Sequence, residues 1–337
     1  IGLDTAKSVF QVQGVDPDHQ PVLRRQLKRR QVLPFFTKLP PCLVGIEACS
    51  ASHHWARELT QLGHTVRLIP PRYVKPYVKS QKNDATDAEA ICEAVTRPNM
   101  RFIAAKSRKQ QSMLMLHRTS HLLVRQRTAS INAIRAHLTE FGIVAGIGRN
   151  GVDALLKTIA DETDERIPEL ARGCLLALGQ QLESIKRQIK DFDAKIMAAH
   201  RNNELSRRLE AIPGVGPRIA TALVASIADP KAFRSGRQMA AWIGLVSKQN
   251  SSGGRDKLGG VTKAGDRYLR SMLMIGALSV VKRVKPLGYT HRPWLAELMV
   301  RRPIKVAAIA LANKIIRMVW AMMVRGERYR EPGALSA

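Results

Sequence analysis

The pattern of apolar and polar positions divides the chain into a strand-rich first third and a largely helical remainder. Short apolar and β-branched runs bounded by polar turns predict strands within 1–15, 22–30, 42–48 and 64–70. The periodicity and end signals of 52–63 and 83–97 predict helices. Residues 1–105 are therefore expected to form a mixed sheet with helices packed on it.

A heptad seam marks the middle of the chain, 106–208. Residues 111–142 contain neither Pro nor Gly before their end. Farther on, apolar residues alternate at spacings of three and four, at Leu175, Leu178, Leu182, Ile185, Ile189, Phe192 and Ile196. This spacing predicts an antiparallel or intermolecular coiled coil, and packing of helices within one chain explains it equally well. The segment between, 143–165, is predicted to be a turn region.

The last part, 209–330, has a mostly helical pattern that one polar stretch interrupts. Residues 248–260 read KQNSSGGRDKLGG, and Leu258 is their only apolar residue. Such a stretch does not belong to a core. It is either a flexible linker or a mobile loop that brings a serine hydroxyl to a substrate.

The charge of the chain indicates a polyanionic partner. Lys and Arg number 55 against 27 Asp and Glu, which gives a formal net charge of +28 at pH 7. This excess destabilises a compact chain unless a polyanion neutralises it, so nucleic acid is favoured over a merely soluble basic protein. The 337 residues also exceed the roughly 250–300 at which a single core stops growing, which predicts two or three domains.

Membrane and disulfide classes are not favoured. The most apolar stretch, 304–324, contains Lys305, Lys314 and Arg317, which is typical of an amphipathic helix rather than a spanning one. The four cysteines form no CxxC pair, so neither a disulfide framework nor a zinc site is expected. No signal peptide is recognised, and a cytoplasmic location is expected. The chain opens on Ile1, so a few preceding residues are expected.

Four acids of the first part are candidate metal ligands. Asp4 lies inside an apolar strand and Glu47 at the end of another, and a buried carboxylate is costly without a metal or hydrogen bonds. Asp84 and Asp87 share one face of a predicted helix. Each acid alone is more ordinarily a solvated end residue. Together they offer the oxygen ligands that two Mg²⁺ ions need for phosphodiester chemistry.

Two further segments are candidate nucleic-acid contacts. IPGVGPRIATAL, 212–223, resembles a helix-hairpin-helix, in which N–H groups at Gly214 and Gly216 bind a phosphate with support from Arg218; the alternative is a tight turn without a ligand. The second segment is a basic stretch that consists of Arg24, Arg25, Lys28, Arg29 and Arg30. The alternative explanation of these cations is a solvated surface without a ligand. Aromatic residues make up only 5%, so phosphate contacts are expected rather than base stacking.

Seven short motifs, in their order and spacing, resemble one family along essentially the whole chain. They are GLDTAK at 2–7, GIEA at 45–48, DATDAEAI at 84–91, IPGVGPRIATAL at 212–223, AAWIGLV at 240–246, NSSGG at 250–254 and TKAGDRYLR at 262–270. The family is that of the DEDD-type insertion-sequence transposases, the RNA-guided IS110 family and its IS1111 branch.

The resemblance implies a RuvC-like, RNase H-like α/β domain at 1–105, a helical coiled-coil region at 106–208 and a mostly α C-terminal transposase domain at 209–330. It implies that Asp4, Glu47, Asp84 and Asp87 bind the metal. It further implies a noncoding RNA that pairs with donor and target DNA, a composite site from two protomers in a dimer or tetramer, and a bacterial cytoplasm with nucleoid association.

In this family a loop serine attacks DNA, and the resemblance places that serine at Ser251, with Ser252 as the adjacent alternative. A serine hydroxyl is a weak nucleophile that needs activation, which metal-binding carboxylates would help to supply. The glycine pairs at 253–254 and 259–260 would let the loop move. Three cations would hold DNA phosphates: Arg255, Lys257 and Lys263. With the acids and the family pattern, the loop is interpreted as catalytic rather than as a linker.

Three functions from different classes follow. The first is a Mg²⁺-dependent serine recombinase that moves its own element. The second is a metal-dependent junction nuclease in which the serine loop is inert. The third is a non-catalytic nucleic-acid scaffold, which would have no reason to bury Asp4. Replacement of Ser251 separates the first two, because only the recombinase requires its hydroxyl.

Overall fold

The computed structural model describes residues 1–79, 83–284 and 292–330. The chain divides into two compact units, each of which is treated by itself. The first, the N-terminal unit, holds 1–110 together with 227–234. The second, the helical unit, holds 111–226 and the chain from 235 onward. The boundary between a separate middle region and a C-terminal domain, expected near 208, stays a prediction.

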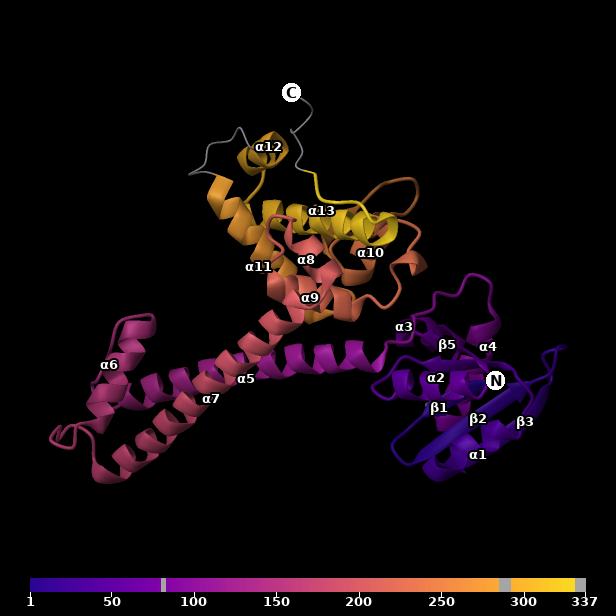
Figure 1. The fold of residues 1–337 in the computed structure, drawn as a ribbon, viewed down its shortest axis with the longest axis horizontal. Helices are drawn as coiled ribbons and strands as arrows, with labels where there is room; N and C mark the ends of the chain where they lie inside the picture. Colours follow the sequence, from indigo (N-terminus) through magenta and orange to yellow (C-terminus); the bar gives the residue numbers. More distant parts are fainter. Residues whose placement is uncertain (80–82, 285–291, 331–337) are drawn as a thin grey trace. The chain divides into compact units, whose positions relative to one another are not determined.

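A five-stranded mixed sheet forms the centre of the N-terminal unit (Figure 1), in the order β3-β2-β1-β4-β5. Its strands are β1 (Gly2–Thr5), β2 (Val9–Val15), β3 (Pro21–Lys28), β4 (Leu43–Glu47) and β5 (Thr65–Ile69). The first three strands pair antiparallel, whereas β1 with β4 and β4 with β5 pair parallel. The mixed sheet expected from the sequence is confirmed.

Helices cover both faces of this sheet. They are α1 (Val32–Thr37), α2 (Ser52–Gln61), the short α3 (Pro71–Val74) and α4 (Asp84–Thr96). Leu3 and Phe10 lie in one core with Phe36 of α1 and Trp55 of α2. Because side chains alternate along a strand, the neighbours of Leu3 in β1 face the opposite side, where α4 packs.

Two glycines let α4 lie directly on the strands. A Cβ at Gly2 would overlap the carbonyl oxygen of Ala88, and one at Gly45 would lie 2.7 Å from Cβ of Val95. Any larger residue would therefore push α4 off the sheet. This close contact gives a physical reason for glycine in the motifs GLDTAK and GIEA.

Three helices form the extended part of the helical unit (Figure 1): α5 (Arg108–Thr139), α6 (Arg149–Ala160) and α7 (Glu169–Arg201). The heptad seam of α7 packs inside the chain. Leu175 and Leu182 lie in a core with Ile134 of α5 and Leu155 of α6. Ile185 and Ile189 pack on Leu123 of α5 in the same way. These contacts support packing within one chain as the explanation of the seam.

The turn region expected at 143–165 is wrong, because it contains α6. The error came from reading its Gly and Asp residues as breakers. Val152, Leu155 and Ile159 recur at helical spacing and are all buried, so the segment is an amphipathic helix that covers the end of the seam.

In the described part of the helical unit, six more helices and a small sheet follow. The helices are α8 (Glu204–Glu210), α9 (Pro217–Ser226), α10 (Gly236–Ile243), α11 (Arg267–Val284), α12 (Pro293–Arg301) and α13 (Ile304–Arg325). The two-stranded sheet consists of β6 (Ser247–Gln249) and β7 (Leu258–Val261). Among the described residues, 209–330 is thus mostly helical, as expected from the sequence.

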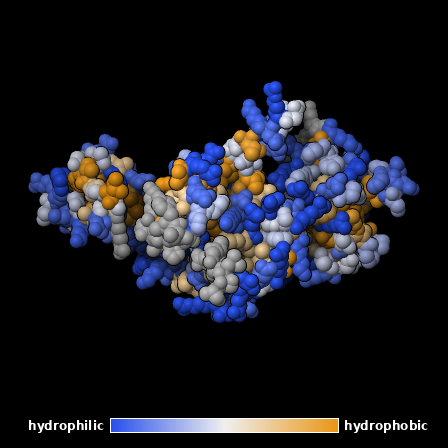
Figure 2. Space-filling model, turned by 90° about the horizontal axis from the view of Figure 1, so that it is seen from above, coloured by the Kyte–Doolittle hydropathy of each residue, from blue (hydrophilic) through white to orange (hydrophobic). Residues whose placement is uncertain are grey.

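One described helix, α13, is long and apolar enough to cross a membrane by length and composition alone. Its residues Leu311, Ile315, Ile316 and Val319 are buried, and it packs on α10 and α11. These contacts are those of the central helix of a bundle. The surface seen in Figure 2 is predominantly hydrophilic, with hydrophobic residues in scattered patches.

A buried histidine joins three helices of this unit. The two ring nitrogens of His117 in α5 lie 3.0 Å from the hydroxyl of Tyr268 in α11 and 3.0 Å from Oγ1 of Thr221 in α9. Burial, together with the nearby Arg218 guanidinium, lowers the pKa of His117 to about 4. The native unit therefore holds this imidazole neutral at pH values where the unfolded chain protonates it.

We expect the helical unit to lose stability as pH falls from 6.5 towards 4. A depressed histidine pKa means that the unfolded state binds the proton first, which costs about 2 kcal/mol of unfolding free energy between pH 7 and 4.5. Urea unfolding at both values, in wild type and His117→Asn, checks this. His117→Asn should flatten the pH dependence by that amount, whereas His137→Asn, at an exposed position of α5, should not. If wild type and His117→Asn lost the same unfolding free energy between the two pH values, this prediction would be refuted.

Candidate functional site

The two strand acids lie near the carboxyl ends of two neighbouring central strands of the sheet. Leu3 of β1 pairs in register with Ile46 of β4, and Asp4 and Glu47 are the next residue of each strand. They have the same parity as Gly2 and Gly45, so they face the side that α4 covers. Both side chains are half-buried, so the full burial expected of Asp4 is not observed.

The two helix acids lie in the first turn of α4. Asn83 caps this helix, since its side-chain oxygen accepts the N–H of Ala85 at 3.0 Å. Asp84 is exposed and Asp87 is half-buried. Asp87 immediately precedes Ala88, the residue whose carbonyl touches Gly2 of β1. The three elements that carry the acids, β1, β4 and α4, therefore pack against one another.

The donor set fits a hard divalent cation by its chemistry, since it consists of carboxylate oxygens from adjacent elements. Within 1–79, 83–284 and 292–330, no group of three or more His, Cys, Asp or Glu side chains lies close enough together to hold a metal ion. A Mg²⁺ site at Asp4, Glu47, Asp84 and Asp87 thus stays a prediction.

The basic stretch of β3 is not one continuous surface. Arg24 lies on the α4 face, where its Nε donates to Oε1 of Gln13 at 3.1 Å and its guanidinium lies 3.8 Å from Glu89. Arg25 lies on the opposite face, over the ring of Phe35. Strand alternation therefore separates residues that the sequence interpretation grouped together. All five members of the stretch are exposed, including Lys28, Arg29 and Arg30.

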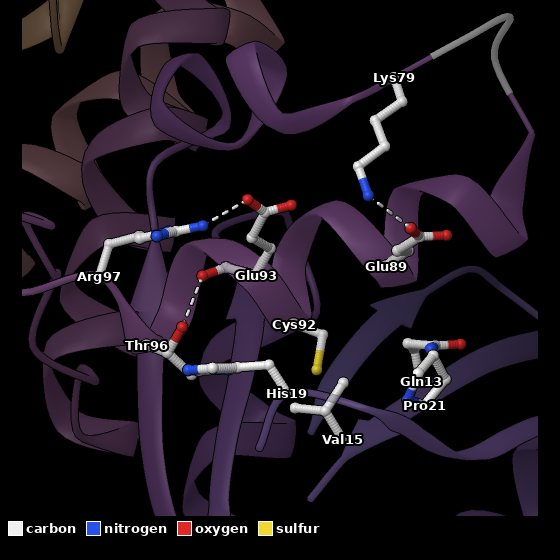
Figure 3. Close-up of a pocket in the computed structure, with 10 residues that line it drawn as sticks. All are labelled: Gln13, Val15, His19, Pro21, Lys79, Glu89, Cys92, Glu93, Thr96 and Arg97. Carbon is white, nitrogen blue, oxygen red and sulfur yellow. Dashed lines mark hydrogen bonds and ion pairs between the residues drawn. The ribbon is translucent and has the colours of Figure 1, made fainter. Parts of the chain in front are cut away.

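A pocket of about 360 Å³ opens between the β2–β3 hairpin and α4 (Figure 3). Lys79 and Glu89 face each other across its upper part at 3.0 Å. Arg97 and Glu93 form a second ion pair, at 2.5 Å. Cys92 lies between these pairs, on the floor of the pocket. The sequence analysis did not predict this pocket. Each of its two ion pairs includes a glutamate of α4, so we assign these charges to stabilising that helix.

The turn of the helix-hairpin-helix-like motif contacts another helix. Gly214 has φ 89°, and a Cβ there would lie 2.9 Å from the carbonyl oxygen of Gly276 in α11. Helix packing therefore accounts for glycine at this position. Gly216 faces open space. The tight-turn explanation accounts for Gly214, and phosphate binding at Gly216 stays a prediction.

Arg218 in α9 is already engaged within the helical unit. Its guanidinium pairs with Asp193 of α7 and donates to Oγ of Ser120 in α5 at 3.0 Å. These contacts join α5, α7 and α9. The phosphate-binding role predicted for Arg218 therefore competes with a structural one.

The serine stretch is a β-hairpin rather than an irregular loop, which corrects the sequence interpretation. Strands β6 and β7 pair antiparallel, with Ser247 opposite Val261 and Gln249 opposite Leu258. Gly253 and Gly254, with φ 57° and 76°, form its tip. The second glycine pair, 259–260, lies inside β7 and is not a hinge between elements. Residues 248–260 are all exposed, including Leu258.

Close backbone contacts anchor the base of this hairpin. A Cβ at Gly244 would overlap the backbone of Ala264, and one at Gly265 would overlap the carbonyl of Trp242. Arg270 of α11 then donates to the carbonyls of Ile243 at 2.9 Å and Ala264 at 2.7 Å. The motifs AAWIGLV and TKAGDRYLR therefore hold the hairpin on the helices.

The Ser251 hydroxyl makes three hydrogen bonds within the hairpin. It donates to Oδ1 of Asp256 at 3.1 Å, and it accepts from Nε2 of Gln249 and from the N–H of Lys257, each at 3.2 Å. Ser252 takes part through its backbone, since its carbonyl accepts the N–H of Arg255 at 3.1 Å. The structure thus distinguishes the two adjacent serines.

Sequence reasoning missed Asp256 and Gln249 as partners of Ser251. The signal was present in the stretch itself. A turn centred on Gly253 and Gly254 places residue 251 across from residue 256, as in any tight hairpin. Reading the stretch as a loop removed that geometric constraint. The cations Arg255, Lys257 and Lys263 are exposed, as a phosphate-binding role requires.

A groove of about 710 Å³ opens beside the hairpin base, between β6, β7, α12 and α13. Trp294 and Lys314 lie on its wall, with the Lys314 ammonium 4.6 Å from the centre of the indole ring. Arg317 lines it as well. The hairpin that carries the serine therefore has cationic side chains at both its tip and its base.

Comparisons with known proteins place these features in a family. A family model described as "Transposase IS116/IS110/IS902 family" matches residues 206–291, and a DEDD-type IS110 model described as "Transposase" matches residues 1–143. The chain is 48% identical to a "Probable family 20 transposase" of Pseudomonas aeruginosa, over 99% of this chain and 98% of the relative. It is 48% identical to "Putative transposase y4pF/y4sB" of Sinorhizobium fredii, over 98% and 85%. It is also 38% identical to "Transposase for insertion sequence element IS1111A" of Coxiella burnetii, over 98% and 91%.

Proposed function

The chain belongs to the IS116/IS110/IS902 family of insertion-sequence transposases, and from this premise we propose that it cuts and rejoins DNA through a covalent link to Ser251. Membership of the family makes it a DNA-binding enzyme that cleaves and recombines DNA. The nucleophile, the metal and the guide are the parts that we propose.

The observation that carries the proposal is the position of Ser251. Its hydroxyl lies in an exposed hairpin whose base is fixed by backbone contacts and whose flanks carry Arg255 and Lys257. A plain linker would need neither the fixed base nor the hydrogen bonds at the hydroxyl. Attack by Ser251 on a DNA phosphate would keep the energy of the broken ester in a phosphoserine link, so that strands rejoin without ATP.

We propose that Asp4, Glu47, Asp84 and Asp87 hold Mg²⁺, with two ions as the expected number. A bound divalent ion would supply Lewis-acid stabilisation of charge at the scissile phosphate. The support lies in the carboxylate donor set and in the parallel pairing of Leu3 with Ile46, the residues that directly precede Asp4 and Glu47. The acids themselves would neutralise part of the repulsion that the ions exert on one another.

Guidance by a noncoding RNA is proposed from the family resemblance and from the net charge of +28. So large an excess of cations fits a protein that binds RNA as well as donor and target DNA. We also propose a dimer or tetramer in which one protomer supplies the acids and another the serine. Cytoplasmic, nucleoid-associated location follows from the same proposal.

A covalent-adduct assay tests the proposal. The protein is incubated with junction DNA labelled at one end, the noncoding RNA that flanks its element, and Mg²⁺, and the reaction is quenched in denaturant. DNA that migrates with protein is the expected product. Cleaved DNA without an adduct would instead identify a metal-dependent nuclease in which the hairpin is inert. DNA that is bound but never cut would favour a scaffold.

We expect Arg255→Gln to weaken binding to all DNA sequences about equally. Log affinity falls with log salt concentration, and each phosphate that a cation neutralises makes this negative slope steeper by about 0.9. The slope of Arg255→Gln should therefore be shallower than that of wild type by about one. Fluorescence anisotropy at several salt concentrations measures it. Arg166→Gln is the matched control, since Arg166 is exposed but pairs with Asp164 at 2.6 Å. An unchanged slope for Arg255→Gln would exclude this phosphate contact.

A further inference from the structure

We propose that Asp256 is the general base of the serine hairpin: it takes the proton of the Ser251 hydroxyl as Ser251 attacks DNA. This inference rests on the proposed serine chemistry and adds the group that activates it. A serine hydroxyl becomes an effective nucleophile when a base within about 2.6–3.2 Å accepts its proton. Oδ1 of Asp256 lies 3.1 Å from Oγ of Ser251.

The hydrogen-bond inventory of Ser251 directs its proton to that carboxylate. A hydroxyl has one proton to donate and two lone pairs that accept. Gln249 Nε2 and the Lys257 N–H are both donors, at 3.2 Å each, and they occupy the accepting side. The Asp256 carboxylate is the one acceptor of the three. The proton therefore points at Asp256, which is the orientation that proton transfer needs.

The hairpin itself fixes this arrangement. Asn250 donates its N–H to the carbonyl of Lys257 at 2.8 Å, and Arg255 donates to Ser252 at 3.1 Å. These two bonds enclose positions 251 and 256 on either side. The positive φ values of Gly253 and Gly254 close the turn between them, a conformation that other residues adopt only with strain. Ser251 and Asp256 are thus held across from one another by backbone geometry.

The neighbouring serine lacks such a partner. The hydroxyl of Ser252 makes no hydrogen bond to any residue in the described part of the chain, and its carbonyl is used in the turn. An unactivated serine reacts poorly at neutral pH. The presence of a carboxylate at one serine and not at the other therefore assigns the nucleophile to Ser251.

The step balances in atoms and charge. Oγ of Ser251 forms a bond to phosphorus while the ester bond from phosphorus to one deoxyribose oxygen breaks. The serine proton moves to the Asp256 carboxylate, and the leaving oxygen takes a proton from water to become the hydroxyl end of the cut strand. In the reverse step that hydroxyl attacks the phosphoserine and gives up its proton to hydroxide in the solvent, while the bond from phosphorus to Oγ breaks and Asp256 returns its proton to Ser251.

Gln249 is a positioning residue in this scheme. Its amide reaches the same oxygen that attacks, from the strand on which Ser251 follows. Together with the Lys257 N–H it holds the accepting side of the hydroxyl, which keeps the Ser251 proton directed at Asp256.

Single-turnover adduct formation on junction DNA, with the flanking RNA and Mg²⁺ present, tests the assignment. Asp256→Asn keeps the shape of the side chain but removes the base, so the adduct rate should fall about 10²–10⁴-fold, the range of general-base catalysis. DNA affinity, measured in parallel, should stay equal or rise, because a negative charge is removed near the phosphates. A slower reaction with undiminished binding excludes loss of binding as the cause.

Two further variants keep the test decisive if Asp256→Asn disturbs the hairpin. Asp256→Glu restores a carboxylate and should recover part of the rate, whereas Ser252→Ala should react like wild type. An Asp256→Asn rate within threefold of wild type would overturn the inference and leave the serine chemistry standing. A wild-type protein that cuts DNA without any adduct would instead overturn the proposed function itself, whatever the Asp256 variants do.

Discussion

Replacing Ser251 with alanine is expected to reduce both covalent-adduct formation and strand exchange by at least about 10³-fold. The expected size follows because removing a nucleophile leaves only the slow background of a bound, polarised phosphate. The change removes the three hydrogen bonds of the hydroxyl, but Ser251 is exposed and the base of the hairpin is held by other contacts, so the helical unit should still fold. Denaturing gels that follow labelled junction DNA give both quantities in one experiment.

The control for this prediction is the adjacent residue. Ser252→Ala removes a hydroxyl of the same kind one position away and should retain the adduct. Loss of the adduct in Ser252→Ala alone would move the nucleophile to Ser252. Full activity in both variants would return the hairpin to the role of a linker between helices.

If Asp4 is a metal ligand as proposed, replacing it with asparagine should slow cleavage at least about 10²-fold, because a bound metal ion contributes several kcal/mol to stabilising the transition state. Asp4 is the next-to-last residue of β1 and Glu47 is the last residue of the neighbouring parallel strand β4, so neutralising either acid lowers the charge that attracts a divalent ion. Isothermal titration with Mg²⁺, and with Mn²⁺ as a tighter-binding probe, measures the binding itself. Weaker binding in Asp4→Asn and in Glu47→Gln supports a common site.

The matched control lies in the same unit. Asp18 is an exposed acid in the turn between β2 and β3, and Asp18→Asn should change neither metal binding nor cleavage. If Asp4→Asn and Asp18→Asn behave alike, the strand acids are not ligands. Unchanged metal binding with lost cleavage would place Asp4 at the substrate rather than at the metal.

Much of the N-terminal unit could be predicted from sequence because its signals are local. Alternation along short apolar runs gave the strands, and acids in the first turn of 84–96 gave the helix that carries them. The contact of Gly2 with Ala88 was not predictable, because nothing in the local sequence tells which helix covers a strand. Without that contact, nothing in the sequence places α4, which carries Asp84 and Asp87, against β1, which carries Asp4.

The helical unit was less predictable because its features depend on partners far along the chain. The spacing of Leu182 and Ile185 is compatible with packing within one chain or between chains. Their contacts with Ile134 and Leu123 of the same chain favour packing within one chain. The sequence predicts that Arg218 is available to bind a phosphate, but it cannot show the ion pair with Asp193, which is distant along the chain. At residues 248–260 the sequence interpretation assigned the wrong type of structure. The glycine-rich polar stretch was interpreted as a mobile loop, although Gly253 and Gly254 lie at its centre as the turn of a hairpin does.

The anchoring of that hairpin has a consequence for how the nucleophile reaches DNA. Two-stranded hairpins are marginal on their own, but this one is clamped to α10 and α11 through Gly244, Gly265 and Arg270. These contacts fix the base of the hairpin to the helical unit, so Ser251 is expected to move together with that unit. In the proposed mechanism, the position of the attacking hydroxyl at the DNA therefore depends on how the whole helical unit binds nucleic acid.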